Sequence, residues 1–99
     1  MSAMTEIEQN YPNASLESVA RRCNVSAAYV SSAVKKATGK TFKEHLMEKR
    51  LTKAASLLKS TALSVGDIIV MVGYENTSYF YRIFTEKYGM SPKEYRFLK

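Results

Sequence analysis

The fold is decided by residues 73–96, which read GYENTSYFYRIFTEKYGMSPKEYR. Asparagine, here Asn76, often caps the start of a helix. The aromatic residues at positions 80, 84 and 88 follow it at a spacing that places them on one face of a helix. Gly89 is the residue type that most often ends helices. Ser91 then opens a second start signal, with proline at the first helical position and glutamate at the third. The stretch therefore predicts a helix between Asn76 and Gly89, followed by a second helix that begins after Ser91.

The same organisation occurs earlier in the chain, as an internal repeat. Residues 15–25 match residues 64–74 at an offset of 49, and residues 30–44 match residues 80–94 at an offset of 50. The matched positions include Ser15 with Ser64, Val30 with Phe80, Val34 with Phe84, Gly39 with Gly89, and Thr41 with Ser91. Each copy predicts a short helix, a tight turn and a longer helix, which is the helix-turn-helix unit. Two copies with matched caps and stop glycines favour this unit over an arbitrary helical hairpin.

Helix signals also fill the rest of the chain. Thr41 and Glu44 form a capping box, which opens a run without proline or glycine from Phe42 to about Lys59. Ser15, Ser26 and Ser64 are further caps, a short first helix carries Ile7 and Tyr11, and sustained period-two alternation is absent. The predicted fold class is all-α, with about seven helices in one domain, 1–99. It comprises a first helix-turn-helix subdomain (5–40), a long central linker helix (41–60) and a second helix-turn-helix subdomain (61–99).

The amino-acid composition excludes several classes of function. The chain has 99 residues, a net charge of +6 and 45% hydrophobic residues, which indicates one small folded domain. A single cysteine excludes a disulfide framework and a cysteine-based zinc site, and a single histidine weakens metal binding and Ser-His catalysis. The longest apolar run, 68–72, is far too short for a membrane span. We therefore expect a cytoplasmic protein with no catalytic residues, metal, cofactor or membrane partner.

The charge is concentrated in the middle of the sequence. Residues 1–20 carry −3, residues 21–59 carry +8, and residues 60–99 carry +1. A basic middle third favours a polyanionic partner. Solvated helix faces with scattered lysines explain the same charge about as well, so charge alone leaves both interpretations open.

The motif at 73–96 is similar to the signature of the AraC/XylS family of bacterial transcription regulators. The first copy is similar through Ser26, Tyr29, Ser31, Lys35, Thr38, Gly39 and Phe42, and residues 50–58 resemble the family's Arg-Leu…Ala…Leu-Leu pattern. The resemblance covers roughly residues 5–96. It implies two helix-turn-helix subdomains that each place a recognition helix in the DNA major groove. It also implies that an effector-binding or receiver domain precedes this domain in most members. Ser32 departs from the arginine or lysine that the family often has there.

The recognition helices of this reading begin near residues 27 and 77 and supply the candidate DNA contacts. Arg82 is expected to read guanine, because recognition helices touch base edges with residues near their start and arginine pairs with guanine. The residues predicted to face bases are Ala28, Ser31, Ser32, Thr77, Ser78 and Arg82. The residues predicted to face phosphates are Lys35, Lys36, Lys40, Thr41, Lys43, Ser91 and Lys93.

Three other features have structural interpretations. Cys23 falls on the apolar stripe of its helix and is predicted to be a small buried hydrophobe. Arg50 falls on the inward stripe of the central helix, where we expect a buried ion pair that holds the subdomains rather than a DNA contact. Phe80 and Phe84 have the spacing of core residues, which is a commoner use of that pattern than a platform for stacking RNA bases.

The predicted function is non-enzymatic, sequence-specific binding of double-stranded DNA by a bacterial transcription regulator. The rival is a helical module that docks a sensor domain or an RNA polymerase subunit, with DNA binding secondary. RNA binding is a third class, for which no motif is present. The expected partners are a DNA operator, RNA polymerase, and a sensor or receiver domain if the chain is an excised fragment. The isolated domain is expected to be monomeric.

The central helix also predicts the layout of the operator. Its 18 residues from Phe42 to about Lys59 would span about 27 Å, and the flanking turns and half-helices extend this toward the roughly 34 Å of one DNA turn. We therefore expect the two recognition helices to enter adjacent major grooves of an asymmetric, two-box site.

Overall fold

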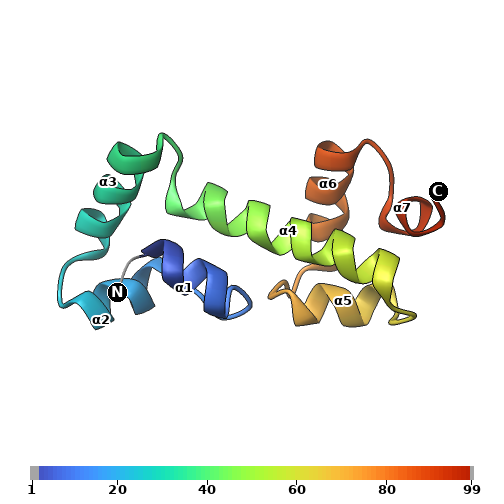
Figure 1. Ribbon diagram of the computed structural model, residues 1–99, viewed down its shortest axis with the longest axis horizontal. Helices are drawn as coiled ribbons and strands as arrows, with labels where there is room; N and C mark the ends of the chain where they lie inside the picture. Colours follow the sequence, from blue (N-terminus) through green and yellow to red (C-terminus); the bar gives the residue numbers. More distant parts are fainter. Residues whose placement is uncertain (1–2, 99) are drawn as a thin grey trace. The chain divides into compact units, whose positions relative to one another are not determined.

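A computed structural model describes residues 3–98, which contain seven helices and no strand. The prediction of an all-α chain with about seven helices is confirmed (Figure 1). Within the same residues no helix is long and apolar enough to cross a membrane. The helices, in chain order, are α1 (Ala3–Asn10), α2 (Leu16–Cys23), α3 (Ala27–Thr38), α4 (Phe42–Ser60), α5 (Val65–Met71), α6 (Thr77–Tyr88) and α7 (Pro92–Phe97).

Local capping explains where the helices begin. Ser26 and Asn76 accept hydrogen bonds from the third residue of α3 and of α6, and these bonds satisfy N–H groups that the helix itself leaves open. Ser91 and Glu94 form the predicted capping box of α7. At Ser15 the box is also present, but there the cap N–H donates its return bond to the hydroxyl oxygen of Ser18 in place of a glutamate.

The longer helices of the two repeats, α3 and α6, end in the same way. Gly39 and Gly89 follow α3 and α6 with φ angles of 81° and 74°. A Cβ added to either glycine would meet nothing within 4 Å, so the glycines are needed for the left-handed backbone and not for space. Asn24 takes the same backbone region after α2, with φ 57°. Stops of this kind keep the turns short and fix where each longer helix can begin and end.

The chain divides into two compact units within α4, the first ending at Lys49 and the second beginning at Arg50. In the first unit α1, α2, α3 and the start of α4 pack around one core. Its buried residues are Ala3, Ile7, Ala14, Val19, Ala20, Val30, Val34, Phe42 and Leu46. The α2–α3 pair is the first helix-turn-helix, and Figure 1 shows the two helices joined by a short turn.

The second unit repeats this arrangement with α5, α6 and α7 and the second part of α4. Phe80 and Phe84 have no exposed surface, and their ring centroids lie 5.6 Å apart. The Phe84 ring also meets Tyr95 of α7 edge-on, with the centroids 5.6 Å apart. The prediction that these two phenylalanines are core residues is confirmed. Arg96 connects α7 to the end of α4, because its Nε donates a 3.0 Å hydrogen bond to the Leu58 carbonyl.

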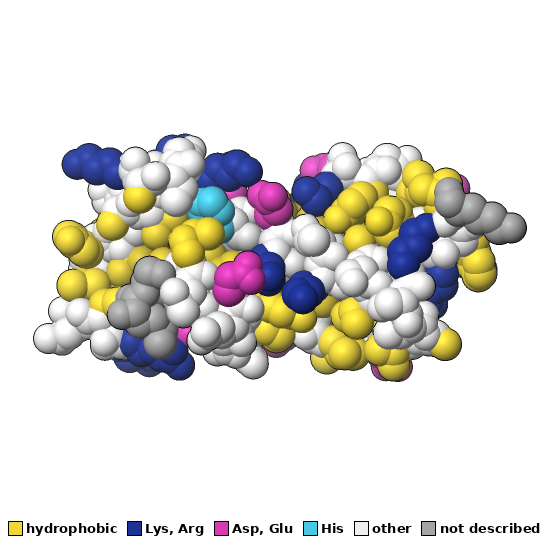
Figure 2. All heavy atoms as spheres, in the orientation of Figure 1, with side chains coloured by type: hydrophobic (Ala, Val, Ile, Leu, Met, Phe, Trp, Pro, Cys, Tyr) yellow, Lys and Arg dark blue, Asp and Glu magenta, His cyan; other side chains and the backbone are white. Residues whose placement is uncertain are grey.

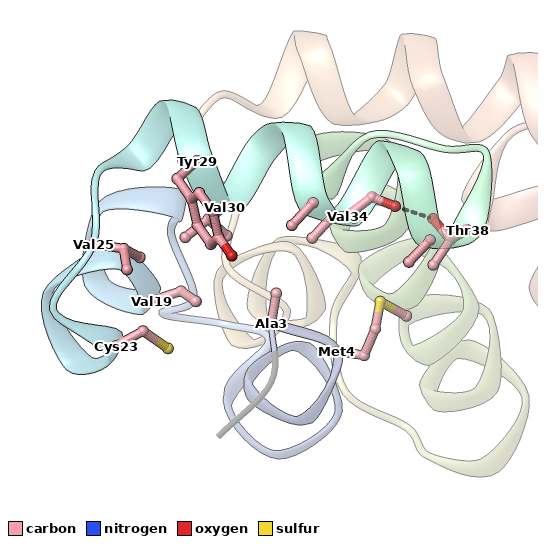
Figure 3. Close-up of a pocket in the computed structure, with 11 residues that line it drawn as sticks. Ala3, Met4, Val19, Cys23, Val25, Tyr29, Val30, Val34 and Thr38 are labelled. Atoms are coloured by element: carbon pink, nitrogen blue, oxygen red, sulfur yellow. Dashed lines mark hydrogen bonds between the residues drawn. The ribbon is translucent and has the colours of Figure 1, made fainter.

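The prediction that Cys23 is buried is wrong, because its side chain is exposed. Cys23 is the last residue of α2, where the chain turns away at Asn24, so α3 does not cover it. Its thiol faces an apolar groove of about 290 Å³ between α1, α2 and α3. Figure 3 shows Cys23 at this groove together with Met4, Val25 and Tyr29. The apolar face of α2 that contains Cys23 is thus only partly covered by the neighbouring helices.

Candidate nucleic-acid interface

The outer face of α3 consists of Ala28, Ser32, Lys35 and Lys36. These residues recur at one face of the helix, opposite the buried Val30 and Val34, and all four are exposed. Ser31 is half-buried and lies at the edge of this face. Figure 2 shows basic side chains in dark blue gathered over the end of α3, at the upper left of the view, where the last turn of α3 carries Lys35 and Lys36.

The outer face of α6 consists of Ser78, Arg82, Thr85 and Glu86, which are the positions of the α3 face shifted by 50. All four are exposed, while Phe80, Ile83 and Phe84 on the opposite side are buried. Thr77 is also exposed, at the first residue of the helix. The structure therefore brings Ser78 and Arg82 together on a free helix face, which a groove-binding helix requires.

Arg82 is held by two neighbours on its own helix. Its Nη1 donates to Oε1 of Glu86 at 3.2 Å, and its guanidinium carbon lies 5.1 Å from the ring centroid of Tyr79. The Arg82 and Glu86 side chains are 62% and 65% exposed, so the pair contributes only about 0.3–0.5 kcal/mol to stability. Sequence reasoning missed Glu86 and Thr85, although the four-residue spacing of Arg82 and Glu86 is a readable signal for an ion pair.

The predicted phosphate-facing lysines are all exposed, but two of them already have contacts. Lys35 Nζ donates to the Gly39 carbonyl at 3.0 Å, and Lys40 forms an ion pair with Glu48 at 3.1 Å. Lys36, Lys43 and Lys93 are exposed. Both contacts are made by exposed side chains and are weak, so neither removes its ammonium group from the surface.

Thr41 and Ser91, the two predicted phosphate contacts at helix starts, already face carboxylates. The backbone N–H groups of Thr41 and Ser91 each donate to Oε1 of a glutamate, Glu44 and Glu94, at 2.9 Å. Both glutamates have a pKa below the usual value. The main cause is the hydrogen bond from the backbone N–H of the cap residue, and the second cause is a hydrogen bond with its hydroxyl. A phosphate at either helix start would compete with a carboxylate, and the phosphate contacts predicted for Thr41 and Ser91 stay predictions.

The turn between α5 and α6 contacts both of these helices. The Tyr74 N–H donates to the Ile69 carbonyl at 3.0 Å, and the Tyr74 ring lies 5.8 Å from that of Phe80. The Arg50 guanidinium carbon lies 5.1 Å from the Tyr74 ring centroid. Burial raises the pKa of Tyr74, and the positive charge of Arg50 opposes this rise. Arg50 thus contacts the aromatic face of the turn, and the acidic partner expected for it stays a prediction.

Comparison with known proteins is consistent with this geometry. The helix-turn-helix domain family matches residues 19–97. The xylose operon regulatory protein of Escherichia coli is 39% identical over 72 residues, which are 73% of this chain and 18% of that protein. The chain is also similar to the C-terminal domain of AraT, a response regulator from Geobacillus stearothermophilus, with 38% identity and a TM-score of 0.88 over 95% of this chain and 79% of that one.

A second solved domain has the same fold. The C-terminal domain of the two-component response regulator yesN from Fusobacterium nucleatum is 33% identical, with a TM-score of 0.87 over 95% of this chain and 93% of that chain. Fold and outer faces together define a protein with two helix-turn-helix units. The chain belongs to the AraC/XylS family of DNA-binding transcription regulators. Since the chain spans only 18% of the length of its xylose-operon relative, the family match concerns this domain.

Proposed function

We propose that this domain binds double-stranded DNA in a sequence-specific manner, as the DNA-binding part of a bacterial transcription regulator, and catalyses no reaction. The observation that carries the proposal is the pair of matched outer faces on α3 and α6, each exposed and each opposite a buried apolar face. Arg82, Ser78 and Thr77 would face bases from α6, and Ala28, Ser31 and Ser32 would do so from α3. Small side chains on α3 permit a close approach to DNA but offer little hydrogen bonding to base edges.

Affinity would come mainly from lysines. Lys35, Lys36, Lys40 and Lys43 all belong to the first unit, and each phosphate they neutralise releases counterions from the DNA. Lys93 would add a contact from the second unit. The two recognition helices would enter successive major grooves of one duplex, with α4 as the connection between them.

A direct test is binding of the purified chain to short duplexes in a mobility-shift assay across a salt series. Sequence-specific binding predicts that one duplex, selected from a randomised pool, binds much more tightly than random sequence. It also predicts that the affinity for both falls steeply as the salt concentration rises. Equal affinity for selected and random duplexes would favour the rival, a helical module that docks a protein.

Further partners follow from the same reading. In a longer regulator, a sensor or receiver domain would control this domain, and RNA polymerase would be the machinery that it recruits or blocks. We place the protein in the bacterial cytoplasm, where the operator lies, and expect the isolated domain to be monomeric. Sedimentation of the free domain, and of its complex with one duplex, measures that stoichiometry.

A further inference from the structure

We infer that Glu86 is a positioning residue that makes Arg82 a reader of guanine instead of an anchor for phosphate. This inference rests on the proposed binding of α6 in a major groove. It starts from the ion pair between Arg82 Nη1 and Glu86 Oε1 at 3.2 Å, on the exposed face of α6. It also uses the Tyr79 ring, whose centroid lies 5.1 Å from the Arg82 guanidinium carbon.

The ion pair leaves most of the guanidinium free to donate. A guanidinium has five N–H donors, and a carboxylate that takes one at Nη1 leaves donors at Nη2 and Nε. The carboxylate and the Tyr79 ring restrain the side chain from both directions along the helix, because Tyr79 precedes Arg82 by three residues and Glu86 follows it by four. Restraint of this kind lowers the entropy that is lost when a fork of two hydrogen bonds forms on guanine O6 and N7.

The negative charge of Glu86 also affects which groups of the DNA attract Arg82. A lone arginine is attracted to any phosphate, because a Coulomb attraction has no sequence preference. Glu86 reduces that attraction, since a phosphate several ångströms away meets the charges of both partners of the exposed pair. Hydrogen bonds to guanine survive this reduction, because they depend on direction and close contact. The ion pair thus lowers the part of the affinity that is independent of sequence and keeps the part that discriminates between bases.

The internal repeat supports this division of roles. At the offset of 50, Lys36 of α3 stands where Glu86 stands in α6, and Ser32 stands where Arg82 stands. The outer face of α3 therefore pairs a small residue with an exposed lysine, and the outer face of α6 pairs a long arginine with an acid. The first face is built for phosphate affinity, and the second is built for base discrimination.

The test compares Glu86→Gln with the matched control Lys36→Gln in the full 99-residue chain. Binding is measured to the selected duplex, to all its single-base-pair variants and to a random duplex, across a salt series. Glu86→Gln should steepen the salt slope by about 0.9, tighten random binding, and lower the preference for guanine at the base pair of Arg82 by about fivefold. Lys36→Gln should instead make the slope shallower by about 0.9, and every base preference should remain.

Three outcomes separate failure of this inference from failure of the proposed function. If the wild-type chain selects no sequence, both fail. If Arg82→Ala abolishes one guanine preference while Glu86→Gln leaves that preference intact, the DNA-binding proposal stands and the role of Glu86 is overturned. Loss of preference at a different base pair in Glu86→Gln would mean that the carboxylate reads its own base, which also overturns the positioning role. Unchanged far-ultraviolet circular dichroism shows that each variant is folded.

Discussion

Among single residues, Arg82 is the one from which we expect the largest effect on sequence discrimination. Its side chain is 62% exposed, long, and held at one helix face, so it has both the reach and the donors for a base edge. No other residue of the two outer faces offers a fork of donors, since the rest are small, singly hydroxylated, or point charges. Specificity should therefore be unevenly distributed between the two recognition helices, with most of it in α6.

Arg82→Ala should weaken binding to the selected duplex by about 1–3 kcal/mol and relax the preference at a single base pair. The physical reason is the loss of two hydrogen bonds to guanine, while the helix itself keeps its buried face. The measurement is affinity across all single-base-pair variants of the duplex. Lys87→Ala, in the last turn of the same helix, is the control and should preserve every preference. Unaltered selectivity in Arg82→Ala would refute the role of this arginine.

Single residues also show where sequence reasoning reaches its limit. The exposure of Arg82 and the burial of Phe84 could be predicted, because a helix with a known period has a known inner face. The exposure of Cys23 could not, because it depends on where α3 turns away after Asn24, which is a tertiary fact. The contact of Arg50 with Tyr74 was missed for the same reason, since these residues are distant in sequence and meet only in the folded second unit.

At the element scale, the two lysines in the last turn of α3 test how affinity arises. Replacing Lys35 and Lys36 with glutamine should weaken binding to selected and random duplexes alike, and should lower the salt slope by about 0.9 for each lost phosphate contact. Lys35 also donates to the Gly39 carbonyl at 3.0 Å, so circular dichroism of the variant should confirm that α3 is intact. A loss of affinity confined to the selected duplex would show that these lysines read bases.

The capping boxes of α4 and α7 should make the stability of the fold depend on pH. The pKa values of Glu44 and Glu94 are lowered by hydrogen bonds at the caps, so the charged carboxylates stabilise the folded state. That stabilisation is present above the unfolded pKa, about 4.5, and is lost as the pH falls through the lower folded values. The double variant Glu44→Gln, Glu94→Gln should therefore melt below the wild type near neutral pH, and the two should converge in acid.

Thermal unfolding at a series of pH values measures this convergence. Glutamine is the suitable replacement, because its amide can still accept a hydrogen bond while it carries no titrating charge. A melting difference that stays constant from neutral pH to below the carboxylate pKa would show that the charge of the two glutamates contributes nothing. Glu17→Gln, in the first turn of α2, is a control for the loss of a negative charge near a helix start without a capping-box glutamate.

Elements were more predictable than individual contacts, because their boundaries are set by local chemistry. The caps at Ser26, Asn76 and Ser91 and the stop glycines lie within a few residues of the groups that they satisfy. Such signals can be read without knowledge of the tertiary fold. At Ser15 the cap itself was predictable, but the return bond that its N–H donates to Ser18 Oγ was not, because serine at that position is a weaker signal than glutamate.

At the scale of the whole molecule, the duplicated unit and the single helix α4 determine what kind of operator is expected. The outer faces of α3 and α6 differ at matched positions, so a chain that uses both should recognise two different half-sites and need no palindrome. Successive major grooves on one side of a duplex are about 34 Å apart. The 19 residues of α4 span about 28 Å as one helix, which is a connection of the right order for neighbouring grooves.

The spacing of the two boxes should therefore determine the affinity. Inserting two base pairs between them should weaken binding, because the DNA must then twist or bend to present both boxes. Inserting five base pairs, about half a helical turn, moves the second box to the opposite side of the duplex, and binding should fall to the level of a single box. The measurement is the affinity of the chain for the three duplexes. Sequence-changed versions of each box serve as controls, because they show whether both boxes are still read. If binding with five inserted base pairs is undiminished and still depends on both boxes, one chain does not need to occupy adjacent grooves on one side of the duplex, and the proposed layout is refuted.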